Sequence, residues 1–319
     1  MHYDVFNGDA DGIISLVQLR LAHPRQSVLI TGVKRDISLL ERVDAKQASS
    51  VTVLDISMEK NITGLSLLLA NNVAVFYADH HRSGPIPDSS CLSAHIDTNA
   101  NTCTALIINN FLDNLYPLWA ITAAYGDNML AAAELLADEQ GLSDDERSQL
   151  KNFGTYINYN GYGSVVDDLH IAPDALFREL VQYDNPFDII SQPNSIFSRL
   201  EKAYNEDMAN AEKAYVIVDN EVCKMFELPD EAWARRVSGV FGNALANLSP
   251  KKAHAVFTRN LDDTYTVSLR APLENKQGAG DICAKFATGG GRAAAAGVNQ
   301  LSKDSVDEFI TAVMDYYRE

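Results

Sequence analysis

The sequence predicts an α/β protein: a parallel sheet with helices on both faces, a helical connector, and a smaller C-terminal α/β domain. Three observations predict it. Over the first 130 residues, short apolar runs alternate with longer helical patterns, and acidic or imidazole residues follow several of the runs. After about residue 215 the pattern changes to strands with fewer helices. Strands that alternate with helices are typical of a parallel sheet covered on both faces.

The elements of the first domain follow one another in a regular order. A strand in YDVFN precedes a helix in DGIISLVQLRLAH, which ends before Pro24. Three more strands are expected in SVLITG, SSVTVLDIS and VAVFYADHH, with helices between them in DISLLERV and ITGLSLLLANN. Residues 103 to 212 are expected to be mostly helical, with helices in CTALIINNFL, LWAITAAYGDNMLAAAELLADE and NSIFSRLEKAYNEDMANAEKAY.

The last third of the chain has a different composition of elements. Strands are expected in YVIVDNEVCKMF, HAVFTR and YTVSLRA, and helices in RRVSGVFGNALANL and SVDEFITAVMDYY. We therefore predict a first domain over residues 1–190, a helical connector over 191–213 and a second domain over 214–319.

Composition narrows the class of protein. Acidic residues outnumber basic ones 43 to 26, giving a net charge of −17, which argues against binding long nucleic acid. Four cysteines without C-x-x-C spacing predict reduced thiols and a cytoplasmic protein. No secretory signal is visible, and the most apolar stretch, GLSLLLANNVAVFYA, is too short to span a bilayer. The sequence leaves a homodimer open.

Acidic and imidazole side chains follow three of the predicted strands. In an open parallel sheet, ligands bind beyond the carboxyl ends of the strands, so these side chains are expected at one edge. Another carboxylate interrupts an alanine-rich helical stretch. The residues concerned are Asp9 and Asp11 after the first strand, Asp55 after the third, Asp79, His80 and His81 after the fourth, and Asp127 in AAYGDN.

A cluster of this kind predicts bound cations. Carboxylates brought that close repel one another, and some would have to be protonated. Two divalent cations would balance the charges of Asp9, Asp11, Asp55 and Asp127, with His80 as a neutral ligand. Mixed oxygen and imidazole ligands suit Mn²⁺, and Mg²⁺ is the alternative. The simpler interpretation is a set of separate turns at strand ends, where aspartate is common.

Five motifs in this order resemble the DHH superfamily of phosphoesterases. DADG, LDIS, ADHH and YGD match its four N-terminal motifs, and VSLRAPLENKQGAGDICAKFATGGGRAAAAG resembles the DHH-associated C-terminal domain. The resemblance covers nearly the whole chain. It implies a metal-dependent phosphoesterase; known activities of the family include hydrolysis of short oligoribonucleotides, adenosine bisphosphate, cyclic dinucleotides and pyrophosphate, and RecJ-type exonuclease action.

The resemblance also implies roles for single residues. Asp55 would bridge two metals, Asp11, His80 and Asp127 would complete one site, and Asp9 would serve the other. His81 would face the substrate phosphate, and Asp79 would orient its neighbours. A water activated by the metals would then attack phosphorus in line.

Two positions depart from the family pattern. Val5 stands where many members have a histidine that binds the metal held by Asp9, and Asn7 is a poor substitute. We therefore expect that metal site to be weak and to fill fully only when a substrate phosphate adds oxygen ligands. Arg292 stands where the family usually has histidine, after Gly289, Gly290 and Gly291.

The C-terminal glycines and arginines predict phosphate binding. Backbone N–H groups of the triplet would form an anion-binding nest beside Arg292, and Arg270 would be a second phosphate-binding arginine. The alternatives are a glycine turn needed only for close packing and solvated arginines. Lys34 and Arg35 either touch phosphate or form a solvated pair.

We conclude from the sequence that the chain is a cytoplasmic, Mn²⁺-dependent phosphodiesterase. The expected substrate is a short 5′-phosphorylated oligoribonucleotide, above all a linear dinucleotide such as pGpG or pApA, cleaved to mononucleotides as a nanoRNase does. A cyclic-dinucleotide or adenosine-bisphosphate phosphoesterase is the alternative, and so is a catalytically degenerate protein that binds a nucleotide in signalling.

Overall fold

A computed structural model describes residues 1–99 and 101–318 of the chain. It contains two compact units, Met1–Ala203 and Tyr204–Glu319. The division between them falls within helix α9 (Ile196–Ala211), inside the expected connector. The functional assignment of the ranges 1–190, 191–213 and 214–319 stays a prediction.

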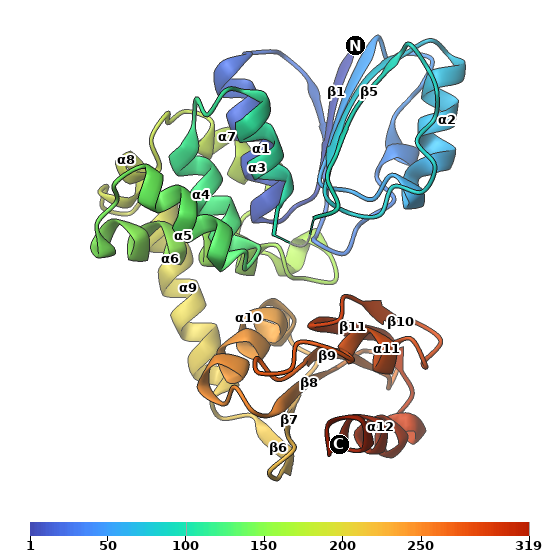
Figure 1. Ribbon diagram of the computed structural model, residues 1–319, viewed down its shortest axis with the longest axis vertical. Helices are drawn as coiled ribbons and strands as arrows, with labels where there is room; N and C mark the ends of the chain where they lie inside the picture. Colours follow the sequence, from blue (N-terminus) through green and yellow to red (C-terminus); the bar gives the residue numbers. More distant parts are fainter. Residues whose placement is uncertain (100, 319) are drawn as a thin grey trace. The chain divides into compact units, whose positions relative to one another are not determined.

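The first unit is built on a five-stranded sheet in which all neighbouring strands are parallel (Figure 1). The order across the sheet is β2-β1-β3-β4-β5. The strands are β1 (His2–Phe6), β2 (Val28–Ile30), β3 (Ser50–Leu54), β4 (Ala74–Asp79) and β5 (Leu92–Ile96). The order reverses between β1 and β3, and ligands bind at such switch points, beyond the carboxyl ends of the strands.

Helices cover both faces of this sheet, as the sequence predicts (Figure 1). Helix α2 (Ile62–Ala70) lies on one face, and α1 (Ala10–Ala22) and α3 (Thr104–Phe111) lie on the other. Five more α-helices precede α9 among the described residues of this unit: α4 (Pro117–Gly126), α5 (Leu130–Glu139), α6 (Asp144–Asn160), α7 (Pro173–Leu180) and α8 (Pro186–Ile190). The α/β class with a parallel sheet is confirmed.

The structure differs locally from the expectations of the sequence. DISLLERV does not form a helix of its own length, and the structure has only a 3-10 turn at Leu40–Arg42. The Asn61 side chain explains this, because its Oδ1 accepts from the Leu40 N–H (3.2 Å) and its Nδ2 donates to the Ile37 carbonyl (2.6 Å). These bonds satisfy backbone groups that a helix would pair. Strand β5, at the edge of the sheet, is not expected from the sequence.

The stretch LWAITAAYGDNMLAAAELLADE forms two helices. Helix α4 ends at Gly126, and Asn128 adopts a left-handed conformation with φ +63° before α5 begins at Leu130. Asparagine tolerates that conformation better than most residues. The break leaves Asp127 at the end of α4 rather than inside a helix.

The second unit contains a mixed six-stranded sheet in the order β10-β11-β9-β8-β7-β6. The β7–β8 pair is parallel and the other pairs are antiparallel. Its strands are β6 (Tyr215–Asp219), β7 (Cys223–Leu228), β8 (Ala253–Arg259), β9 (Tyr265–Arg270), β10 (Gly289–Gly291) and β11 (Ala295–Leu301). Its helices are α10 (Ala232–Leu248), α11 (Ala279–Cys283) and α12 (Val306–Arg318).

Each unit has its own apolar core. In the first, Val5, Val53 and Leu65 belong to one buried cluster on the sheet. In the second, Phe257 and Phe309 pack with their rings 5.5 Å apart, edge to face. Within the described ranges, no helix is long and apolar enough to cross a membrane.

Candidate metal centre

The ends of three strands and one helix bring the predicted carboxylates and histidines together in the first unit. The glycines of FNGDADGI allow the first turn to form there. A Cβ on Gly8 would lie 1.8 Å from the Gly32 carbonyl oxygen, and a Cβ on Gly12 would lie 2.4 Å from that of Asn7. Only glycine fits such contacts between backbones. The two glycines are therefore explained by the packing of the protein's own backbone.

Asp9 is the N-cap of α1. Its Oδ1 accepts from the backbone N–H groups of Asp11 and Gly12, each at 3.1 Å. Its Oδ2 lies 2.5 Å from the Lys34 ammonium. Both oxygens of this buried carboxylate thus have protein donors.

Asp11, two residues later, binds the beginning of α3. Its Oδ2 accepts from the Thr104 N–H and its Oδ1 from the Ala105 N–H, both at 2.7 Å. The N-terminus of a helix favours negative charge, because its first N–H groups have no partner inside the helix. Helix α3 therefore fixes the direction of the Asp11 carboxylate.

Asp55 follows β3 with a left-handed backbone, φ +59°. Its Oδ1 accepts from the Thr104 hydroxyl at 3.1 Å and lies 3.6 Å from His80 Nε2. Aspartate is one of the few residues that adopts this conformation at modest cost. The same residue of α3, Thr104, thus contacts two of the predicted metal-ligating carboxylates.

His80 lies at the centre of the cluster. Its Nδ1 lies 3.0 Å from the Thr102 carbonyl, to which it donates as the N–H tautomer. This leaves the Nε2 lone pair facing carboxylate oxygens of Asp11 (3.8 Å), Asp55 (3.6 Å) and Asp127 (3.9 Å). A carbonyl that fixes the tautomer in this way is typical of a metal-ligating histidine.

Asp127 gives the clearest indication that this cluster can bind a cation. Its buried Oδ2 has no hydrogen-bond partner among the described residues, although it lies 3.9 Å from His80 Nε2. Leaving a buried carboxylate oxygen without a partner is costly. Ligand atoms of Asp11, His80 and Asp127 all lie within 4.8 Å of one another, which fits one metal ion.

His81 points partly into solvent, with its side chain 46% exposed, whereas Asp79 is fully buried. His81 Nδ1 lies 2.7 Å from Asp79 Oδ1. Burial alone would lower the pKa of His81, but the hydrogen bond to Asp79 raises it above the usual value. Asp79 therefore holds this imidazole in place, with Nε2 left for another partner.

The buried carboxylates differ in their electrostatics. Burial raises the pKa of Asp11, and burial together with the nearby carboxylates raises the pKa of Asp55 well above its usual range. Burial would raise the pKa of Asp9 as well, but the Lys34 ammonium lowers it. The pKa of Lys34 in turn is raised well above its usual range, because Asp9 outweighs the effect of burial. Asp11 and Asp55 thus lack the balancing charge that Asp9 has.

The phosphate-binding residues expected in the second unit have different surroundings. Arg270 is held within its own unit: its guanidinium donates to Asn243 Oδ1 (2.6 Å), Ser268 Oγ (3.0 Å) and the Gly239 carbonyl (3.2 Å). The Arg292 side chain is exposed, and it makes no hydrogen bond or ion pair with the residues that the structure describes. The roles of both arginines in binding phosphate stay predictions.

The glycine triplet forms the edge strand β10, paired with β11. Packing requires glycine at one end of it, because a Cβ on Gly289 would lie 1.8 Å from the Cys283 carbonyl oxygen. A Cβ on Gly290 would meet nothing within 4 Å, so that backbone borders open space. Gly291 has φ +143°, which favours glycine.

Sequence reasoning missed the contribution of residues 102–105 and the position of Lys34. The residues at the start of α3 reach the site through backbone groups and one hydroxyl, which carry little signal in a sequence. For Lys34 the sequence predicts only a contact with phosphate or solvent. Its position after a strand of the same sheet was the available clue.

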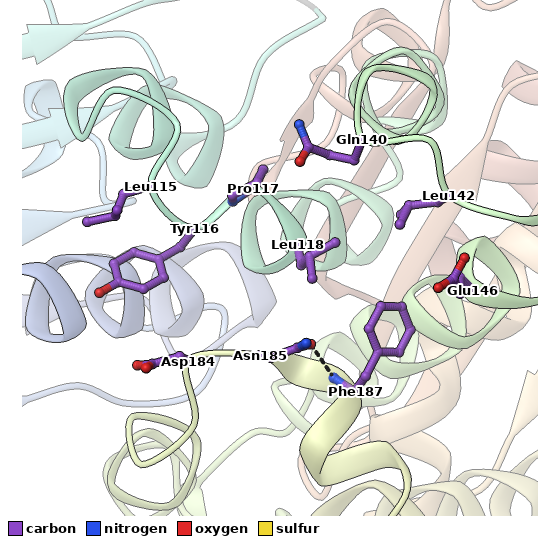
Figure 2. Close-up of a pocket in the computed structure, with 10 residues that line it drawn as sticks. All are labelled: Leu115, Tyr116, Pro117, Leu118, Gln140, Leu142, Glu146, Asp184, Asn185 and Phe187. Atoms are coloured by element: carbon purple, nitrogen blue, oxygen red, sulfur yellow. Dashed lines mark hydrogen bonds between the residues drawn. The ribbon is translucent and has the colours of Figure 1, made fainter.

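A separate pocket of about 360 Å³ lies in the helical part of the first unit (Figure 2). It is lined by the start of α4, the α5–α6 connection and the start of α8, where Asn185 accepts from the Phe187 N–H at 2.9 Å. It shares no residue with the carboxylate–histidine cluster. This pocket is therefore a different site from the candidate metal centre.

No protein-family model and no curated protein matches the sequence, but solved structures do match the fold. Exonuclease RecJ bound to manganese has a TM-score of 0.58 at 17% identity, over 100% of this chain and 90% of that one. RecJ from Thermus thermophilus, in complex with Mn²⁺, has a TM-score of 0.64 at 16% identity, over 99% of this chain and 52% of that one. This chain thus spans about half the length of that protein.

A third solved structure is similar over almost the full length of both chains. It is the pGpG-specific phosphodiesterase PggH from Vibrio cholerae, with a TM-score of 0.55 and 14% identity, over 100% of this chain and 99% of that one. At these identities, the comparisons establish a common fold.

Proposed function

The chain has the fold of the DHH phosphoesterases, and on this premise we propose that it is a metal-dependent phosphodiesterase of that superfamily. The proposed substrate is a short 5′-phosphorylated oligoribonucleotide, above all a linear dinucleotide, and the products are mononucleotides. Asp11, Asp55, His80 and Asp127 would bind the metal, with Mn²⁺ favoured over Mg²⁺ by the imidazole ligand.

One observation carries this proposal: His80 Nε2 faces three carboxylates while its Nδ1 is held by a carbonyl, and the buried Asp127 Oδ2 beside it lacks a partner among the described residues. The donor set fits a divalent cation of the first transition row. Such an ion lowers the pKa of a bound water and stabilises charge on phosphate oxygens. A set of independent strand-end turns would not leave these atoms facing one another.

The chain's own residues prepare the remaining chemistry. Asp79 accepts from His81 Nδ1 and raises the pKa of that imidazole, so a protonated His81 can donate from Nε2 to a phosphate oxygen. Helix α3 and Thr104 hold Asp11 and Asp55 in fixed directions. The substrate oxygen would therefore meet a fixed donor and a fixed set of ligands.

The choice of a dinucleotide rests on three supporting points. The net charge of −17 disfavours a long nucleic acid. Arg292 is exposed beside the open backbone of Gly290, where a phosphate can be bound. PggH, which shares the fold, is described as pGpG-specific. Arg270 is the weaker candidate, because its guanidinium already has protein acceptors.

A substrate panel with Mn²⁺ tests the proposal. It compares 5′-phosphorylated RNA of two to about seven nucleotides with cyclic dinucleotides, adenosine bisphosphate and pyrophosphate, and identifies products by chromatography. Fastest release of mononucleotides from the dinucleotide is expected. Preference for a cyclic dinucleotide or adenosine bisphosphate would overturn the substrate but keep the metal chemistry. No turnover of any member would favour a protein that binds nucleotides without cleaving them.

Asp55→Asn is the variant that should abolish turnover. Asparagine tolerates the left-handed backbone that Asp55 adopts, so the substitution removes charge without adding backbone strain. Asp113→Asn is its control, because Asp113 lies outside the cluster and has a similar φ of +53°. We expect turnover to be lost in the first variant and retained in the second.

A further inference from the structure

Lys34 lies where the family resemblance predicts a second metal ion, next to Asp9. Its ammonium is 2.5 Å from Asp9 Oδ2, 3.1 Å from Asn158 Oδ1 and 3.7 Å from Asp127 Oδ1. It also lies over the ring of Tyr162, 5.3 Å from its centroid. A cation is therefore already present between the two carboxylates, and the chain supplies it.

The backbone holds Lys34 in this place from both sides. Its N–H donates to the Gly161 carbonyl at 2.9 Å, and its carbonyl accepts from Asn7 Nδ2 at 3.1 Å. The other end of the Asn7 amide accepts from the Asp9 N–H at 3.2 Å. The Asn7 side chain thus connects the turn that carries Asp9 to the backbone of Lys34. The contact between Lys34 and Asp9 is therefore supported by hydrogen bonds on both residues.

The candidate ligands divide into two groups. Asp9 has donors on both oxygens, two amides on Oδ1 and the ammonium on Oδ2. Asp127 Oδ2 and His80 Nε2, by contrast, face each other at 3.9 Å, and no described residue donates to Asp127 Oδ2. Among the described residues, the groupings of ligand atoms close enough for one ion are Asp55 with His80 and His81, and Asp11 with His80 and Asp127. Neither grouping includes Asp9.

Strand β1 has Val5 at the position where the family resemblance predicts a metal-binding histidine. Val5 is fully buried in the core cluster of the sheet, and an apolar side chain cannot bind a metal. At the expected second metal site, the chain therefore lacks the histidine ligand, and the carboxylate ligand Asp9 is paired with the Lys34 ammonium.

We propose that Lys34 replaces the second metal ion, so that the site binds one divalent cation at His80 Nε2, which faces Asp11, Asp55 and Asp127. Asp9 then positions Lys34 and the α1 turn and is not a metal ligand. With its side chain 26% exposed, Lys34 can also reach a substrate oxygen as a fixed positive charge. This proposal rests on the proposed metal-dependent function for the existence of the His80 site.

Counting bound Mn²⁺ tests the proposal without any measurement of activity. Equilibrium dialysis gives the number of ions per chain, and electron paramagnetic resonance distinguishes an isolated ion from a coupled pair. We expect one isolated ion in the wild type, with or without adenosine monophosphate. Lys34→Met should bind a second, coupled ion, because it frees Asp9 while keeping the side-chain length.

The double variant Asp9→Asn with Lys34→Met removes the pair without changing the net charge. It should bind one ion with an affinity within about threefold of the wild type, since neither residue is a ligand, and it decides the matter if Lys34→Met alone does not fold. Much weaker Mn²⁺ binding by the double variant than by the wild type would overturn the proposal.

The wild-type count separates the two proposals. Two ions in the wild type, or a second that appears only with the nucleotide, would overturn the role of Lys34 and leave the proposed function intact. No bound ion in the folded wild type would overturn both.

Discussion

Thr104 offers a sharp test of the metal centre, because its side chain contacts the predicted metal ligands through a single atom, the hydroxyl oxygen. Its hydroxyl donates to Asp55 Oδ1 at 3.1 Å, while its backbone N–H donates separately to Asp11 Oδ2. Thr104→Val replaces the hydroxyl by a methyl group of similar size at a fully buried position. The backbone hydrogen bond to Asp11 remains, so the substitution tests only the hydrogen bond from the Thr104 hydroxyl to Asp55.

The expected magnitude follows from the kind of bond that is lost. A hydrogen bond to a charged group contributes about 1.5–3 kcal/mol. Each 1.4 kcal/mol corresponds to about tenfold in affinity, so Mn²⁺ binding should weaken about 10- to 100-fold. Outer partners that orient metal ligands have effects of about this size.

The assay is a titration that follows free Mn²⁺ by electron paramagnetic resonance at constant pH. Turnover of the preferred substrate should fall at limiting Mn²⁺ and recover at saturating Mn²⁺, because the variant loses affinity and keeps every ligand. Thr122→Val is the control: Thr122 is also fully buried, but its hydroxyl donates to the Leu118 carbonyl within α4. An unchanged or tighter Mn²⁺ affinity in Thr104→Val would refute the reasoning, since the hydroxyl would then compete with the ion.

Two further predictions concern other parts of the chain. Burial alone would raise the pKa of Asp4, but hydrogen bonds from Arg20 and His2 lower it from 3.8 to about 2. Its carboxylate therefore stabilises the fold above about pH 4, and on the order of 2 kcal/mol should be lost as the pH falls from 4 to 2. Urea denaturation should show this loss in the wild type and not in Asp4→Asn, which is less stable at neutral pH; equal pH slopes would contradict it. Arg292→Ala should raise KM for a 5′-phosphorylated dinucleotide about 10- to 100-fold with kcat nearly unchanged, as expected for a lost charged hydrogen bond. The exposed Arg259→Ala is its control, and an equal effect on a dinucleotide without the 5′-phosphate would show that Arg292 does not bind that group.

The sequence predicts the parallel sheet because its buried strands are short apolar runs that end in charged residues. In VAVFYADHH the run covers β4, and the polar residues begin where the strand ends at Asp79. The position of these residues at one edge then follows from the rule for parallel sheets. The same pattern could not predict β5, whose half-exposed residues do not form an apolar run.

The hydrogen bonds that hold the metal-ligating carboxylates in place could not be predicted from the sequence, for a physical reason. The Thr104 and Ala105 amides bind Asp11 across 93 and 94 residues of chain, and backbone amides look alike in every sequence. The missing helix before Leu40 has a similar cause, because Asn61 satisfies that backbone from 21 residues away. Long-range contacts of this kind are fixed by the tertiary fold and override local propensity.

The directions of the pKa shifts divide the carboxylates in the same way as the contacts do. The Lys34 ammonium lowers the pKa of Asp9, so the protein itself balances the charge of this carboxylate. Burial raises the pKa of Asp11 and of Asp55, a shift that disfavours the charged form of both carboxylates. A divalent ion gains most where negative charge is buried and unbalanced. The cation is therefore expected at His80, between Asp11 and Asp55, and not at Asp9, where the expected histidine is Val5 and the balancing charge is an ammonium.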